Sequence, residues 1–395
     1  MKKLLTFLVA VFLMAGSTVR AQEVISSATL PGASSVEDVT MENVVDCGPK
    51  ITLDTRFGYE HQSSGRIGGF GGDGFLLNVD GKIGKRFSYS LSHSLVSPSG
   101  DDSNIFDATR WLTLSYELGN FTFTAGKDAL MVGSFEYDAY ELDCYYEMGS
   151  MFNYNINCWL WGASAMWTNN DETSSFAFQV ANSPFAFAPK EDNLYAYSLA
   201  WYGEWEKYES MWSVNMMEYE PGKFVKMLAL GNMFYLGDFE LMFDYIARAS
   251  DLDNGFGKDY TMTVQPAYNF GESLRLFGRF GVEKTADDVP YDFLGEYLPV
   301  EDKVLANEEN EYVMPAYIAN DKEYIYYGAG LEYFPLKEDK SVRLHAVWAS
   351  NNYTKRHMFN VGLTWKFDVL GAMKFLAGEA KSLTGLFNPD YLIKK

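Results

Sequence analysis

The feature that most constrains this chain is an alternation of apolar and polar residues with a period of two. Phe359, Val361 and Leu363, for example, alternate with polar or small residues. Successive side chains of a β-strand point to opposite faces, so this period predicts strands with one apolar and one polar face. The alternation appears in sixteen segments, at 50–61, 73–84, 86–97, 109–118, 120–126, 157–169, 173–182, 193–206, 210–220, 223–236, 237–249, 258–270, 273–284, 322–334, 340–351 and 356–368.

The connections between these segments fall into two classes that alternate with little exception. The short ones are 84–85, 119, 169–172, 207–209, 237, 271–272 and 335–339. The long ones are 62–72, 98–108, 127–156, 183–192, 250–257 and 285–321. Short turns at one end and loops at the other are typical of an up-and-down antiparallel barrel.

The apolar strand faces allow two interpretations. In a soluble β protein they form the core, whereas in a membrane barrel they contact lipid and the polar faces line a lumen. Aromatic residues make up 16% of the chain, and several stand near strand ends, as in an interfacial girdle: Tyr59, Trp111, Trp159, Trp201, Trp348 and Trp365. The segments are also about 10 residues long, which suits a tilted membrane strand. The membrane barrel is therefore favoured, and the soluble β protein is the alternative.

The ends of the chain differ from the barrel segment 50–368. Residues 1–21 read as an export signal, with two early lysines, an apolar run from Leu4 to Ala15 and a small-residue cleavage site at Ala21. Residues 22–49 would form an N-terminal periplasmic segment. The tail 369–395 has the apolar spacing of an amphipathic helix, which would lie in the periplasm or fold into the lumen. We expect no membrane-spanning helix after the signal.

Charge and cysteine content exclude several classes of protein. The formal net charge of -21 argues against a nucleic-acid partner, which requires a basic surface. Three cysteines are too few for a disulfide scaffold. Cys144 and Cys158 would either form a disulfide in the oxidising periplasm or remain thiols. The four histidines lack the spacing of a metal site, and we expect no cofactor and no metal.

Several short stretches, taken in order, carry a family resemblance. They are Gly81-Lys82, Phe106-Asp107-Ala108-Thr109, Ala125-Gly126-Lys127, Asn182-Ser183-Pro184-Phe185, Ala229-Leu230-Gly231-Asn232 and Asp244-Tyr245 with Arg248. With them the chain resembles the phosphate-selective porins of the O and P type from Bacteroidetes-like Gram-negative bacteria. The resemblance implies an all-β transmembrane barrel of about 16 strands in the outer membrane. It also implies a homotrimer and an inward-folded loop after the fifth strand, at 127–156. Separately, the final strand Gly362-Leu363-Thr364-Trp365-Lys366-Phe367 resembles the targeting signal of outer-membrane barrels, a glycine followed by two spaced aromatic residues.

The polar strand faces and the loop 127–156 supply the candidate pore-lining and solute-binding cations. They are Arg56, Lys82, Arg110, Arg248, Arg275, Arg279 and Arg343 from the strands and Lys127 from the loop. Binding of phosphate requires charge-assisted donors, because dehydration of the anion is costly. The loop 127–156 departs from that requirement, since Lys127 is accompanied by Asp128, Glu136, Asp138, Glu141, Asp143 and Glu147. A ring of such carboxylates would attract cations and repel phosphate. Alternatively, the arginines pair with Asp54, Asp80, Glu240 and Asp244 across neighbouring strands and stiffen the wall.

The sequence thus predicts a porin, a passive channel for small hydrophilic or ionic solutes, with anions such as phosphate among them, and not an enzyme. Its partners would be outer-membrane lipid, lipopolysaccharide and the solutes or ions themselves. Two other functions stay open. The long acidic loops, such as 285–321, could serve a barrel with a binding or adhesion role. His61 beside Ser63 at the rim could belong to a barrel enzyme.

Overall fold

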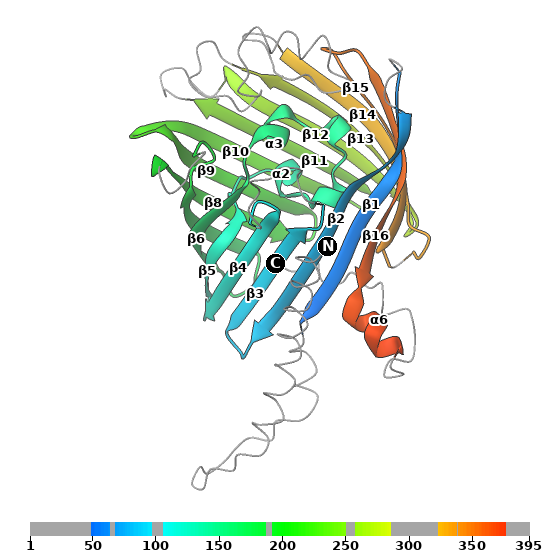
Figure 1. The fold of residues 1–395 in the computed structure, drawn as a ribbon. Coiled ribbons are helices and arrows are strands. Elements are labelled where there is room, and N and C mark those ends of the chain that lie inside the picture. The colour runs from blue at the N-terminus through cyan, green and yellow to red at the C-terminus, as the bar shows by residue number, and fades with distance from the viewer. Residues whose placement is uncertain are drawn as a thin grey trace.

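The computed structural model describes residues 49–63, 68–96, 106–186, 192–249, 257–285, 323–337 and 339–376. The predicted export signal, Cys47, the acidic loop beyond residue 285 and the end of the C-terminal tail lie outside these residues. The described part forms a closed barrel of sixteen antiparallel strands, in which each strand pairs with its neighbours in the chain (Figure 1). Strands β1 and β16 close the barrel with Gly58 opposite Gly362.

The strands match the sixteen predicted segments in order. They are β1 Lys50–Gln62, β2 Gly68–Ile83, β3 Phe87–Ser94, β4 Thr109–Leu118, β5 Phe121–Ala129, β6 Trp159–Thr168, β7 Ser174–Asn182, β8 Tyr195–Trp205, β9 Tyr208–Glu220, β10 Lys223–Leu236, β11 Phe239–Ala249, β12 Asp259–Phe270, β13 Leu274–Lys284, β14 Glu323–Tyr333, β15 Val342–Asn351 and β16 His357–Asp368. Tight turns join them at one end; in the β10–β11 turn Gly237 has a φ of 68°, a left-handed conformation that glycine adopts without strain.

The two faces of the wall show which interpretation of the alternation holds. Large apolar side chains are exposed on the outside, as with Leu114 at 48% and Val361 at 55%. Charged and amide side chains are buried on the inside, as with Asp54 at 2% and Asn360 at 1%. A soluble protein places its apolar faces inward. The wall has the opposite arrangement, which is the one that a lipid environment requires.

Aromatic side chains gather on the outside at the end of the barrel with the tight turns. Trp201 and Trp212 lie 4.9 Å apart between ring centroids, and Trp205 stacks on Tyr208. Tyr208 and Trp212 also donate hydrogen bonds to Asn232. This is the amphipathic arrangement of an interfacial girdle.

The expected place of Trp111 in this girdle is wrong. Trp111 donates to the Ser90 hydroxyl at 2.8 Å, and Ser90 in turn donates to Asp80. Asp80 follows Asn78 on the polar phase of β2, and Asn78 donates to Tyr140 inside the barrel. Trp111 therefore lies on the inner face of the wall.

A short helix, α6 Val369–Leu376, follows the last strand at the end of the barrel with the tight turns (Figure 1). The Asp368 side chain accepts a hydrogen bond from the Gly371 backbone and so caps the helix start. Val369 and Leu370 pack against the cluster of Ile51, Leu77 and Val79. Among the described residues no helix is long and apolar enough to cross a membrane.

Candidate functional site: the inward loop and the lumen wall

The connection between β5 and β6 folds into the barrel, as the sequence predicted. We call residues 130–158 the inward loop, because β5 continues to Ala129 and β6 begins at Trp159. The loop contains the short helices α2 Phe135–Asp138, η3 Glu141–Asp143, η4 Tyr146–Met148 and α3 Met151–Asn155. Figure 1 shows α2 and α3 within the barrel. The apolar side chains of the inward loop pack with apolar residues of the wall. The loop contributes Leu130, Val132, Met151, Phe152 and Ile156, and the wall contributes residues such as Met217, Met227, Ile246 and Tyr326.

The loop begins in close contact with the wall at β7 and β9. Gln179 accepts a hydrogen bond from the Met131 backbone and donates to the Ala129 carbonyl. Asn215 donates to the Met131 carbonyl, and Gly133 donates to the Ser213 hydroxyl at 2.9 Å. The start of the loop is therefore fixed by uncharged polar groups.

Gly133 allows this close approach because it has no side chain. A Cβ atom at position 133 would lie 2.6 Å from the Met211 carbonyl oxygen and 2.6 Å from the Ser213 nitrogen. Both atoms belong to the backbone of β9 and cannot rotate away. Any larger residue must push the loop off the wall.

We expect Gly133→Ala to destabilise the folded barrel by about 1–3 kcal/mol, which is the usual cost of overpacking. Its unfolding in urea, followed by tryptophan fluorescence in lipid vesicles, measures this cost. Gly69→Ala serves as the control, since a Cβ there meets no atom within 4 Å. Equal stability of the two variants would contradict the close packing of the loop on β9.

Two wall carboxylates cap the two α-helices of the loop. Asp244 on β11 accepts from the Ser134 hydroxyl and from the Glu136 nitrogen, both at 2.8 Å, and from the Phe135 nitrogen at 3.2 Å. Glu283 on β13 accepts from the backbone nitrogens at the start of α3. The first backbone N–H groups of a helix lack partners within the helix, so carboxylates are suited to this position.

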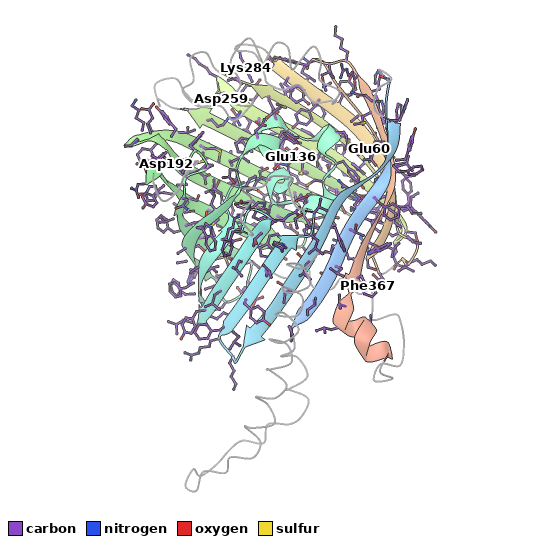
Figure 2. All side chains as sticks on the ribbon, in the orientation of Figure 1. Glu60, Glu136, Asp192, Asp259, Lys284 and Phe367 are labelled. Atoms are coloured by element: carbon purple, nitrogen blue, oxygen red, sulfur yellow. The ribbon has the colours of Figure 1, made fainter. Side chains whose placement is uncertain are left out.

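Glu136 of α2 is the centre of a second set of bonds, and Figure 2 shows it in the middle of the barrel. It is 2% exposed, and its carboxylate accepts from Arg279, from the Thr263 hydroxyl and from the Ser150 nitrogen. Ser150 is the N-cap residue of α3. Glu136 therefore joins both α-helices of the loop to β12 and β13.

The tip of the loop, residues 140–145, binds the other side of the barrel. Tyr140 donates to Asp54 at 2.7 Å. Arg56 donates to the carbonyl oxygens of Leu142 and Cys144. Arg56 and Arg343 both lie over the Tyr145 ring, at 5.4 and 5.8 Å from its centroid. The tip is thus held by two arginines on β1 and β15.

Alternating charges connect the tip to four further strands. Glu240 pairs with Arg275, which also pairs with Glu332. Glu332 pairs with Arg343, and Arg343 pairs with Asp143 of the loop. Asp143 also pairs with Lys366 at 3.5 Å. The positive and negative charges in this ladder are equal in number, so it stiffens the wall and adds no net charge to the lumen.

The remaining predicted cations lie as follows. Arg110 forms an ion pair with Glu141 of the loop. A bulge in the β3–β4 register, in which Ser92 pairs with Trp111 and His93 with Thr109, leaves Arg110 as the extra residue. Arg248 is 1% exposed and pairs with Asp259 at 2.7 Å. Lys82 is exposed near the end of β2.

Lys127 lies differently from the prediction of a pore-lining residue. In the β-sheet register it stands between Leu112 and Trp161, which are 39% and 41% exposed on the outside of the barrel. Its ammonium group donates to the Phe106 carbonyl at 2.6 Å. Lys127 is 9% exposed, so its charge is covered by the β3–β4 connection and does not line an open pore.

The predicted ring of loop carboxylates facing the solute is wrong for three of its members. Glu136, Glu141 and Asp143 form ion pairs with wall cations. The alternative, pairing of arginines with wall carboxylates, holds for Arg275 with Glu240, although these residues lie on β13 and β11, with β12 between them, and not on neighbouring strands. Sequence reasoning missed Glu283 and Glu332 as anchors. Both lie on the polar phase of their strands, but nothing local distinguishes an anchor from any other inward carboxylate.

Cys144 and Cys158 are both free thiols in this structure. Burial raises the pKa of the Cys144 thiol to about 12 and that of Cys158 to about 11. Since the thiolate is the reactive form, both thiols are poorly reactive at neutral pH.

Comparison with known proteins supports the fold. No protein-family model matches the chain, and no curated protein matches its sequence. A loop-deletion mutant of OmpT, an outer membrane protein of Vibrio cholerae, matches with a TM-score of 0.54 and 11% identity over 82% of this chain and 100% of that chain. The trimer form of OmpT matches with a TM-score of 0.53 and 11% identity, over 81% of this chain and 99% of that chain. A mutant of the Rh. blastica porin matches with a TM-score of 0.51 and 9% identity, over 81% of this chain and 100% of that chain. The chain therefore has the fold of a porin-type barrel.

Proposed function

We propose that the protein is a passive diffusion channel of the outer membrane of a Gram-negative bacterium, for small hydrophilic or ionic solutes. The observation that carries this proposal is the wall itself, which is apolar outside, carries charged and polar side chains inside and is crossed by an inward loop. Such a barrel encloses water in a lipid bilayer. The similarity to porin structures supports the same conclusion.

Selectivity for phosphate is less well supported than passage of small hydrophilic or ionic solutes in general. A phosphate site needs donors that are free to replace water around the anion. Arg56 and Arg343 donate to loop carbonyls, while Arg279 and Arg110 pair with loop carboxylates. These bonds favour a structural role for the arginines. The family resemblance therefore extends to the barrel and its inward loop, and we propose weak charge preference in place of phosphate selectivity.

We also propose that the barrels associate as homotrimers, as the trimer form of OmpT does. Cross-linking of the protein in lipid vesicles, followed by gel electrophoresis, would give a trimer band. A single monomer band under conditions that cross-link a known oligomer would contradict this assembly.

Liposome swelling tests the channel function. We expect vesicles that contain the folded protein to swell in isotonic solutions of small sugars and salts, at rates that fall steeply with solute size. Vesicles with heat-denatured protein are the control. Equal swelling with folded and denatured protein would contradict the proposal and would favour the binding or enzymatic alternatives.

A further inference from the structure

The inner face of the wall differs between its two sides. The charge ladder and, apart from Arg110, the charged anchors of the loop lie on β11–β16 and β1. On β3–β7 the inner face between the inward loop and the tight turns is instead rich in hydroxyl groups. We call this set the hydroxyl wall, and it consists of Ser88, Ser90, Thr113, Ser115, Thr122, Thr124, Ser164, Thr168 and Ser175.

The strand register places four of these hydroxyls in one transverse row. Ser88 pairs with Ser115, Ser115 with Thr124, and Thr124 with Ser164. Ser164 pairs with Gln179, which bonds the inward loop inside the barrel. Directly opposed residues of antiparallel strands point to the same face, so the whole row lines the lumen.

The hydroxyl wall remains accessible within the barrel. Each of its residues is partly exposed, whereas the opposite face is covered by the loop, with Arg343 at 7% and Glu332 at 3% exposure. Its hydroxyls form pairs between neighbouring strands, such as Ser115 with Thr124 at 2.8 Å and Thr168 with Ser175 at 2.9 Å. The inner surface of the wall on this side of the loop is therefore accessible.

Within β3–β7 the chemistry of this surface is mainly neutral, with Lys82 beside Ser88 and Asp80 beside Ser90 at its β2 edge. In the described part of the chain, the charged residues on the inner face of β3–β7 are Glu117 and, beside the loop, Arg110 and Asp128. A hydroxyl both donates and accepts, so paired hydroxyls can exchange hydrogen bonds with the hydroxyls of a solute in place of water. They offer no charge to compensate the dehydration of an ion. Trp111 adds an aromatic ring anchored to Ser90.

We propose that solutes cross the barrel along the hydroxyl wall and that neutral polyhydroxylated solutes, of the size of mono- and disaccharides, are the preferred class. This proposal rests on the proposed channel function and names its substrate class. The side chains that set the preference are those of the transverse row, above all Thr124 and Ser164.

The test compares the entry of glucose and of gluconate, an anion of similar size, into liposomes. We expect the unchanged protein to admit glucose faster than gluconate. Thr124→Lys should raise the gluconate-to-glucose rate ratio about fivefold, because one charge beside the path attracts the anion, and Thr124→Glu should lower it. Ser164→Lys repeats the test at a neighbouring position. Asn120→Lys, in the exposed β4–β5 turn, adds the same charge outside the wall and should leave the ratio unchanged.

Two results would overturn the proposal while leaving the channel function intact. One is gluconate entry as fast as glucose entry with the unchanged protein. The other is an unchanged ratio in both Thr124→Lys and Ser164→Lys, with folding confirmed by the gel shift on heating. Failure of every solute to enter with the unchanged, folded protein would instead refute the channel itself, and this proposal with it.

Discussion

Asp244→Ala is expected to release the start of the inward loop and to raise the single-channel conductance. The substitution leaves three donors of α2 without their acceptor, the Ser134 hydroxyl and the nitrogens of Phe135 and Glu136. Each buried donor without a partner costs about 1–3 kcal/mol. The strands keep their own pairing, so the barrel should persist while the loop moves. Planar bilayer recordings measure the conductance directly.

Asp238→Ala is the matched control for this prediction. It removes a carboxylate from the exposed turn that precedes β11, where the backbone carbonyl, and not the side chain, accepts from Asn269. The control should conduct like the unchanged protein. If Asp244→Ala also conducts like the unchanged protein, with the same current noise, Asp244 does not hold the loop in place.

Arg343→Gln should make the channel more selective for cations. Arg343 pairs with Asp143 of the loop at 2.8 Å and with Glu332 of the wall at 3.2 Å. Without it the ladder carries one excess negative charge next to the loop tip. Breaking a buried ion pair costs about 3–5 kcal/mol, so the folded barrel should also lose stability. The reversal potential in a salt gradient reports the selectivity, and urea unfolding reports the stability.

The control for Arg343→Gln is Arg86→Gln, which removes the same charge from the exposed β2–β3 turn. There Arg86 donates to Tyr116 near the surface. We expect a small shift of the reversal potential for Arg86→Gln and a large one for Arg343→Gln. Shifts of equal size would mean that net charge, rather than the ladder, sets the selectivity.

The barrel could be predicted from the sequence because its main signal is local. The period of two reports which strand face is apolar, and the segment 109–118 coincides with β4. The start of β2 could not be predicted in this way. It begins at Gly68, five positions before the predicted 73, because the glycine-rich run Gly68–Gly74 contains few side chains that could alternate.

The arrangement inside the barrel could be predicted only in outline. The length and position of the connection after the fifth strand indicated an inward loop, but its partners are far away in the chain. Asp244 and Ser134 are 110 positions apart, and Arg343 and Leu142 are 201 apart. Charges that look exposed when the loop is considered alone are paired once the barrel closes around it. The net charge of the loop is therefore a poor guide to ion selectivity here.

A planar bilayer recording of the purified, folded protein tests directly whether the barrel is a diffusion channel. A water-filled barrel is expected to give stepwise current increments of uniform size that grow in proportion to the salt concentration. Folding of the same sample should be confirmed by its shift on a gel after heating. A sample that is folded and inserted in the bilayer but gives no current steps would contradict the claim that this barrel is a diffusion channel.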